Sequence, residues 1–373
     1  MIKSKQLSLF EASDISDNLN TKPNDASPSL FGWGFQIMVA LIYSLRDIGH
    51  LKKVIVEGKT EDIELYFDNK DPMFIQVKAK QKINSENDSD DKKCRDAMVT
   101  LLNTSVKVQG KYDALVYATN LPNPLKLNNG QREISWKPEL DIPFEKNYND
   151  LLDTGKSFLN KILISASKRL DKKYNGSLHY FNMDKLFITS IIYNNGAYAD
   201  NERVLRNKIR SLFNNIEFNV VETITDSLFK FYFDKAATSN DNFYKQITKS
   251  ELVWKIIVRY INKTSSPLFV DLDNMPLNIA VEFENYRGNF LSEASCDMGN
   301  VNRVISLFRQ KYSNDSTLKE IKTFINENWS NFAEDLFPNK NQKLQEYCTK
   351  EIMWEILRNY FVIKKVKKET NML

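Results

Sequence analysis

The chain has few cysteines and histidines, with three Cys and two His among 373 residues. Cys94, Cys296 and Cys348 are far apart in the sequence, and there is no Cys-x-x-Cys pair. A structural zinc site needs clustered thiolate or imidazole ligands, and a disulfide-stabilised domain needs a denser set of cysteines. We expect neither. Three cysteines that stay as free thiols are typical of a protein in the reducing cytoplasm.

The sequence also lacks a long hydrophobic run and an excess of charge of one sign. No apolar stretch approaches the roughly 18 residues that a membrane-spanning helix requires, and the N-terminus has no apolar signal core. We therefore expect a cytoplasmic protein without a membrane partner. Lys and Arg number 52 against 48 Asp and Glu, a formal charge of +4. This balance excludes a strongly basic nucleic-acid coat and a binder that relies on an acidic tail.

The length and composition indicate more than one folded unit. A chain of 373 residues with 42% hydrophobic and 12% aromatic residues can bury a sizeable core. Residues 1–30, rich in Ser, Asp, Asn and Pro, are predicted to be a flexible arm. An α/β domain is predicted over 31–235, with an irregular insertion at 121–150 that carries four of the ten prolines. Residues 236–373 are predicted to be mainly helical.

The hydrophobic periodicity predicts the order helix, three strands, helix, strand in the first part of the chain. The predicted ranges are a helix over 33–48, strands over 54–57, 62–67 and 74–80, a helix over 96–107 and a strand over 115–119. Further along, the pattern predicts a helix over 150–170, a strand over 185–193 and a helix over 201–213, and it leaves 220–228 open as strand or helix.

The C-terminal region carries two sequence signals for helix starts. Thr248-x-x-Glu251 and Thr317-x-x-Glu320 both match the capping box, in which a Thr and a Glu satisfy each other's backbone N–H groups. The last helix is predicted over 342–363, and the lysines that follow it suit the negative end of the helix dipole. We expect this region to bind a partner or a second copy of the chain.

Polar side chains alternate with apolar ones on the second and third predicted strands. The polar face carries Asp62 and Glu64 on one strand and Gln76 and Lys78 on the next. Neighbouring strands lie about 5 Å apart, so these four side chains can converge. Carboxylate and amide oxygens suit Mg²⁺, which can polarise a phosphoryl oxygen and activate a bound water. An ammonium group can stabilise the charge that develops on the phosphorus.

Asp62 followed by Gln76-x-Lys78 resembles the D…(D/E/Q)-x-K signature of the PD-(D/E)xK nuclease superfamily. The match has two departures. Glu61 stands where the family usually has proline, and Gln76 is a weaker ligand than the usual carboxylate.

Two further features add to the resemblance. Gly32-x-Gly34-Phe35-Gln36 resembles the helix-opening motif that places a Gln or Glu beside the metal, and Glu57 ends the first strand. The run over about 30–120 is similar to the nuclease effectors of anti-phage defence, both the Cap-type nucleases of CBASS and the nuclease subunit of Lamassu systems.

The resemblance implies a restriction-endonuclease-like fold, a Mg²⁺ cofactor (Mn²⁺ as a substitute) and double-stranded DNA as substrate. It assigns Asp62, Gln76 and Glu57 as metal ligands and Lys78 as the catalytic lysine, with all four in the catalytic set. Gln36 and Glu64 would have supporting roles.

The charge distribution bears on how such an enzyme would hold DNA. Residues 1–120 contain 16 Lys and Arg against 17 Asp and Glu, whereas a nuclease that grips DNA alone usually has a basic stripe. DNA would then be delivered by a partner, by oligomerisation or by the rest of the chain. Because the C-terminal region is predicted to be helical, the resemblance favours the Lamassu arrangement. In that arrangement an SMC-like ATPase and a small accessory subunit restrain the nuclease, which could form a homo-oligomer once activated.

The sequence therefore predicts a metal-dependent DNA endonuclease that acts as the effector of a bacterial antiviral complex. Two alternatives stay open. A stand-alone restriction-type endonuclease would cleave DNA without partners. A non-catalytic scaffold with the nuclease fold would bind DNA or protein and would function without Lys78.

Overall fold

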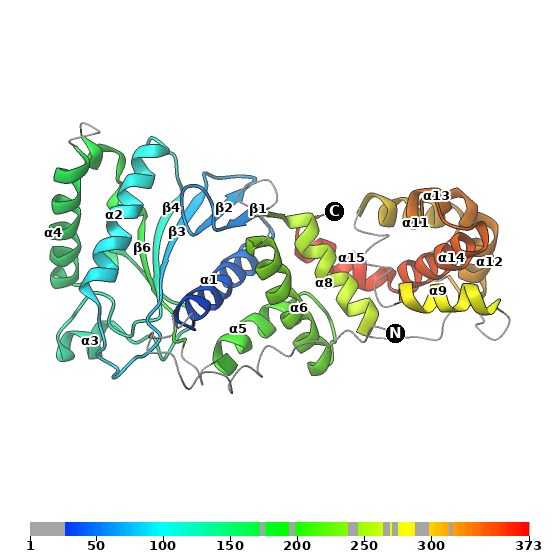
Figure 1. The fold of residues 1–373 in the computed structure, drawn as a ribbon, viewed down its shortest axis with the longest axis horizontal. Helices are drawn as coiled ribbons and strands as arrows, with labels where there is room; N and C mark the ends of the chain where they lie inside the picture. The colour runs from blue at the N-terminus through cyan, green and yellow to red at the C-terminus, as the bar shows by residue number, and fades with distance from the viewer. Residues whose placement is uncertain are drawn as a thin grey trace, which may run out of the picture.

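A computed structural model describes residues 27–171, 176–193, 198–237, 245–263, 269–270, 275–287, 298–312 and 316–372. Within these ranges the chain forms an α/β part and an adjoining helical part, which lie side by side along the long axis (Figure 1). Most of the predicted N-terminal arm is outside the described residues. Its last four residues are helical, because the first helix begins at Ser27.

A seven-stranded mixed sheet forms the centre of the α/β part, in the order β5-β6-β4-β3-β2-β1-β7. β3 pairs with β4 in parallel, and β4 pairs with β6 in parallel. The other four neighbouring pairs of strands are antiparallel. The strands are β1 (Leu51–Val56), β2 (Ile63–Phe67), β3 (Met73–Lys78), β4 (Ala114–Thr119), β5 (Phe144–Asn147), β6 (Leu186–Ser190) and β7 (Gln246–Thr248).

Helices cover both faces of this sheet, as apolar residues on both faces of its inner strands require. One face of β3, β4 and β6 is covered by α2 (Asp91–Lys107) and α4 (Asp153–Leu170). On the other face lie α1 (Ser27–Arg46), α5 (Tyr198–Ser211) and α6 (Phe218–Ala237). Figure 1 shows α2 and α4 together on one side and α1, α5 and α6 on the other. The short helix α3 (Asn129–Ser135) follows β4.

The helical part is organised around one central helix, α14 (Gln342–Arg358), which packs against the helices on either side of it. The other elements are α8 (Lys249–Lys263), α9 (Leu277–Arg287), α11 (Met298–Lys311), α12 (Leu318–Asn328), α13 (Ala333–Leu336) and α15 (Tyr360–Glu369). α15 returns to α8, and the Lys249 ammonium donates to the carbonyls of Gly49 and Asn371. The C-terminal end is thereby tied to the turn before β1.

Much of the predicted order is confirmed. Helix, three strands, helix and strand follow one another as α1, β1, β2, β3, α2 and β4. The open segment 220–228 is helical, within α6. Both capping boxes form, because Glu251 accepts from the Thr248 N–H and Glu320 accepts from the Thr317 N–H.

Four details differ from the sequence predictions. α1 begins at Ser27, so Gly32 and Gly34 lie inside the helix and not at its opening. The segment 121–150 contains α3 and β5, and β5 pairs with β6 at the sheet edge. β7 follows residue 235 yet extends the sheet beside β1. The last predicted helix is two helices separated at Asn359.

Among the residues that the structure describes, no helix is long and apolar enough to cross a membrane. Cys94 and Cys348 are buried free thiols. Cys296 lies outside the described residues.

Candidate functional site

The β2–β3 hairpin brings Asp62 and Gln76 together. The register pairs Ile63 with Ile75, so the preceding Asp62 lies opposite Gln76. One Asp62 carboxylate oxygen, Oδ2, accepts from the Gln76 amide and from the backbone N–H of Val77, the latter at 2.8 Å. The other oxygen, Oδ1, receives no hydrogen bond from the described residues. The two residues that the sequence proposed as principal ligands are therefore direct neighbours.

The backbone of Asp62 is fixed from two sides. Its carbonyl accepts from the backbone N–H of Glu57 at 2.7 Å and from the Gln36 side-chain amide at 2.8 Å. Glu57 has a φ of 57°, in the left-handed region, at the end of β1. Gln36 is buried on α1. Gln36 thus contacts Asp62 through the backbone, which makes it a residue that positions the carboxylate.

Burial and neighbouring charges change the pKa of the Asp62 carboxyl. Burial raises the pKa of the Asp62 carboxyl above its usual value, and the nearby Glu57 carboxylate raises it further. The Val77 N–H and the Lys78 ammonium act in the opposite direction. Lys78 is half-buried at the end of β3, and its ammonium forms no ion pair with the described carboxylates. Asp62 and Gln76 are therefore in direct contact, and the charges of Glu57 and Lys78 both act on the Asp62 carboxyl.

Glu64 has a different environment from the one that its place on the strand suggested. Its side chain is 2% exposed. Oε1 accepts from the backbone N–H groups of Thr60 at 2.9 Å and Glu61 at 3.4 Å, and Oε2 accepts from the Tyr66 hydroxyl at 2.8 Å. Oε1 therefore holds the turn that precedes Asp62, and Oε2 is occupied by a side chain of β2.

The tight fit of Glu64 against Gly58 gives a stability prediction. A Cβ at Gly58 would lie 2.3 Å from Glu64 Oε1 and 2.6 Å from its Cδ, so Gly58→Ala must displace a buried carboxylate from its donors. We expect a loss of about 1–3 kcal/mol in the free energy of unfolding, measured by urea denaturation. The matched control is Gly32→Ala, where nothing lies within 4 Å of the added Cβ. That helical substitution should stabilise by roughly 0.5–1 kcal/mol. Equal effects of the two substitutions would contradict the packing argument.

Glu61 is a candidate that the sequence reasoning passed over, treating it only as a departure from the family pattern. It is 4% exposed, and the Thr104 hydroxyl on α2 donates to its Oε1. Its other oxygen, Oε2, is buried with no hydrogen-bond partner. Burial raises the pKa of the Glu61 carboxyl to about 8, and the neighbouring Asp62 adds to the rise, while Lys107 and Lys78 oppose it. Because one carboxylate oxygen lacks a donor, the pocket around Glu61 favours a proton or a cation there.

No three His, Cys, Asp or Glu side chains among the described residues are arranged to hold a metal ion by themselves. Mg²⁺ does not need such a cage, since it commonly binds through one or two carboxylates with water and substrate phosphate completing its shell. The free Oδ1 of Asp62 and the Gln76 amide match that requirement, with Glu57 and the orphaned Oε2 of Glu61 nearby.

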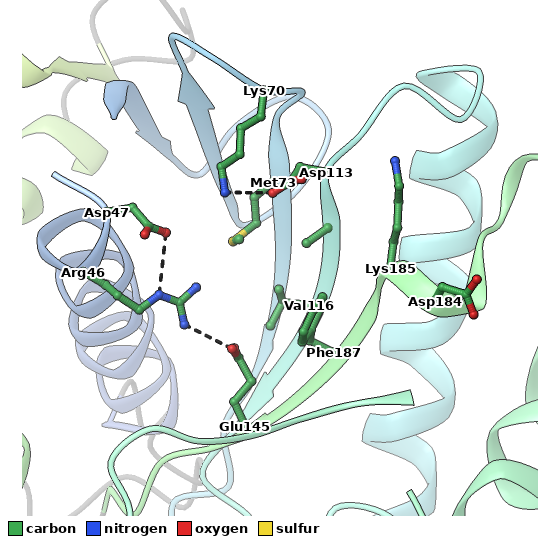
Figure 2. Close-up of a pocket in the computed structure, with 11 residues that line it drawn as sticks. Arg46, Asp47, Lys70, Met73, Asp113, Val116, Glu145, Asp184, Lys185 and Phe187 are labelled. Carbon is green, nitrogen blue, oxygen red and sulfur yellow. Dashed lines mark hydrogen bonds and ion pairs between the residues drawn. The ribbon is translucent and has the colours of Figure 1, made fainter. Parts of the chain in front are cut away.

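A cavity of about 380 Å³ lies elsewhere, at the amino ends of β3 and β4. Figure 2 shows its charged rim: Arg46 pairs with Asp47 and Glu145, and Lys70 pairs with Asp113. Asp62 and the residues that surround it do not line this cavity. Its other two charged residues also have partners, because Asp184 accepts from Asn149 and Lys185 donates to the Tyr112 carbonyl. The cavity therefore does not compete with the hairpin as the candidate reaction centre.

Comparison with protein-family models, with curated proteins and with solved structures finds no match to this chain. The case for a function therefore depends on the geometry of the hairpin and on its resemblance to a nuclease signature.

Proposed function

We propose that the chain is a metal-dependent DNA endonuclease. The observation that carries the proposal is the meeting of Asp62, Gln76 and Lys78 at one end of the β2–β3 hairpin, with Gln36 holding the Asp62 backbone. If the match to the nuclease signature were a coincidence of sequence, its residues would be expected to lie apart in the fold. Here the proposed ligands are in contact, and the lysine is close enough to lower the pKa of Asp62.

The order of elements around the hairpin supports a restriction-endonuclease-like core. A helix, an antiparallel hairpin, a third strand and a helix leading to a parallel fourth strand correspond to α1, β1–β3, α2 and β4. The proposed nuclease core is this run, and the later strands β6, β5 and β7 would widen its sheet.

The residues present suit Mg²⁺ held by Asp62, Gln76 and Glu57. When bound, the ion would polarise a phosphodiester oxygen and lower the pKa of a bound water. Asp62 offers Oδ1 as a free oxygen. Gln76 would offer its amide oxygen after a rotation, because the amide nitrogen now faces Asp62.

The remaining side chains would assist the displacement. Lys78 forms no ion pair with the described carboxylates, so its ammonium can stabilise negative charge on the phosphoryl oxygens. Gln36 and the Glu57 N–H hold the Asp62 backbone still, which limits the movement of the carboxylate. Glu64 supports the same geometry through the turn.

The proposed setting is a cytoplasmic antiviral complex, with double-stranded DNA as substrate. Residues 1–120 have no excess of basic residues, which is consistent with an enzyme whose grip on DNA depends on others. The helical part would bind an SMC-like ATPase and a small accessory subunit, or a second copy of the chain.

One experiment tests the proposal against its two rivals. The purified chain is incubated with supercoiled plasmid and Mg²⁺ or EDTA, alone and with the proteins encoded by its neighbouring genes. We expect Mg²⁺-dependent nicking or linearisation that requires the neighbours or rises with them. Full activity of the chain alone would favour the stand-alone restriction enzyme. Absence of cleavage under every condition, with DNA retained in a gel-shift assay, would favour the scaffold.

A further inference from the structure

A second cavity, of about 300 Å³, lies beyond the carboxyl ends of the parallel strands. Asn120 directly follows β4, Ile192 follows β6, and the segment 83–86 follows β3. In open α/β sheets, ligands bind in the crevice outside the carboxyl ends of the strands. Asn120 also comes directly after Thr119, which pairs with Lys78. The cavity and the proposed catalytic lysine are therefore at the same end of the sheet.

The segments that line this cavity are joined by polar contacts. Asn120 accepts from the backbone N–H of Lys80 at 2.7 Å and donates to the carbonyls of Lys80 at 2.8 Å and Tyr193 at 2.9 Å. The Lys80 ammonium pairs with Asp88 at 2.7 Å, and Asp88 in turn accepts from the Asn84 N–H. The segments after β3, β4 and β6 are thus held together by hydrogen bonds and an ion pair. The cavity is therefore largely pre-formed, as small-molecule sites usually are.

Arg132 on α3 is the notable polar group in the cavity. It is 4% exposed, and its guanidinium donates to the Pro122 carbonyl at 3.4 Å and to Glu139 at 3.3 Å. The third guanidinium nitrogen, Nη1, donates no hydrogen bond to the described residues. A guanidinium that is this buried is costly unless its donors are used. Arg132 lines the cavity, so this nitrogen remains available as a donor to a ligand there.

The rest of the lining indicates which ligand would accept that donor. Ile83, Pro122 and Ile192 supply apolar walls, while Glu86 and Glu139 outnumber the single Arg132. Two carboxylates against one cation disfavour a phosphate inside the cavity and favour a neutral group. Planar nucleobases are recognised between apolar walls through their hydrogen-bonding edges. Guanine accepts from arginine at O6 and N7, and its N–H donors suit a carboxylate.

We propose that this cavity is a guanine-selective nucleobase subsite, in which Arg132 donates to the base and Glu139 accepts from it. The inference rests on the proposed function for its role, which is to hold a base of the DNA strand next to the phosphodiester that is cleaved. Such a subsite would give the enzyme a preference for guanine near the cut. The base pocket itself can be tested without any cleavage.

The test titrates the full chain with deoxyguanosine monophosphate or deoxyadenosine monophosphate in EDTA, followed by calorimetry or NMR. Ser85→Trp on the exposed edge of the cavity should fill it and weaken binding of the guanine nucleotide at least tenfold. Asn87→Trp, on the same loop but away from the lining, is the matched control and should bind as the wild type does. Arg132→Gln should lose the preference for guanine over adenine.

The outcomes separate this inference from the proposed function. Selective binding of the guanine nucleotide that Ser85→Trp removes supports the subsite even if the plasmid is never cleaved. Plasmid cleavage without nucleotide binding would overturn the subsite and leave the nuclease proposal standing. Equal binding of both nucleotides, or binding that survives in Ser85→Trp, also overturns it. Because Ser85 is exposed, the result does not depend on a substitution in the core.

Discussion

Lys78→Ala and Asp62→Asn are each expected to lower Mg²⁺-dependent plasmid cleavage by about a hundredfold to a thousandfold. That is the usual cost of removing one preorganised charge from a reaction centre. Lys78→Ala removes the ammonium that would stabilise phosphoryl charge. Asp62→Asn keeps the shape of the side chain but removes the negative oxygen that is free of hydrogen bonds. The initial rate of loss of supercoiled plasmid measures both effects, in the complex that cleaves best.

The matched control is Lys52→Ala, which removes an exposed lysine from β1 and should leave the rate within about twofold of the wild-type value, because exposed surface substitutions cost little. Circular dichroism and the unfolding midpoint should be near the wild-type values in Lys78→Ala, since Lys78 makes no ion pair with the described residues. Retained cleavage in a folded Lys78→Ala protein would reject the site. Loss of cleavage in Lys52→Ala as well would indicate a general effect of charge on DNA binding.

The contact between Asp62 and Gln76 could be predicted because it depends on strand periodicity and on the pairing of two consecutive strands. Side chains alternate across a strand with a period of two, so the polar face was readable from Asp62, Glu64, Gln76 and Lys78. A hairpin connection then fixes which residues meet across the two strands. The β2–β3 register places Asp62 opposite Gln76 as this reasoning requires.

The environments of Glu64 and Glu61 could not be read from the same pattern. The alternation places Glu64 on the polar face beside Asp62, and it assigns no surroundings to Glu61. The Glu64 carboxylate is held by two backbone donors of the turn and by the Tyr66 hydroxyl of β2. Glu61 is held by the Thr104 hydroxyl of α2. The Glu64 contacts depend on how the turn folds back onto β2, and the Glu61 contact depends on how α2 is placed beside the hairpin. No local periodicity contains that information.

β5 escaped prediction for a related reason. It has four residues, each only partly buried, and the alternation of apolar and polar side chains is too short to be recognised. Its nearby prolines indicated an irregular loop. The strand forms because Glu145 accepts from Arg46 and Thr189, which join it to α1 and β6. Long-range contacts of this kind outweigh local preferences in short edge strands.

Glu61→Gln is expected to change how the free energy of unfolding depends on pH. In the folded chain the pKa of Glu61 is raised to about 8 from an ordinary 4.5, so the folded state holds its proton more tightly than the unfolded state does. Wild-type stability should therefore be greatest, as far as this group is concerned, below pH 4.5 and should fall as the pH rises toward 8. Glutamine at position 61 does not titrate and keeps the acceptor for the Thr104 hydroxyl.

The variant should accordingly match the wild type near pH 4 and exceed it in stability near pH 9. At 1.36 kcal/mol per pH unit the ceiling of that gain is ~5 kcal/mol. Urea denaturation from pH 4 to 9 in EDTA measures it without any contribution from bound metal. Glu133→Gln, an exposed carboxylate on α3, is the control and should show no such trend. Parallel pH curves for Glu61→Gln and the wild type would mean that Glu61 is ionised in the folded chain without penalty. The unpartnered Oε2 would then have to be stabilised by a cation or a donor that approaches it in solution, and addition of Mg²⁺ to both proteins would distinguish these two cases.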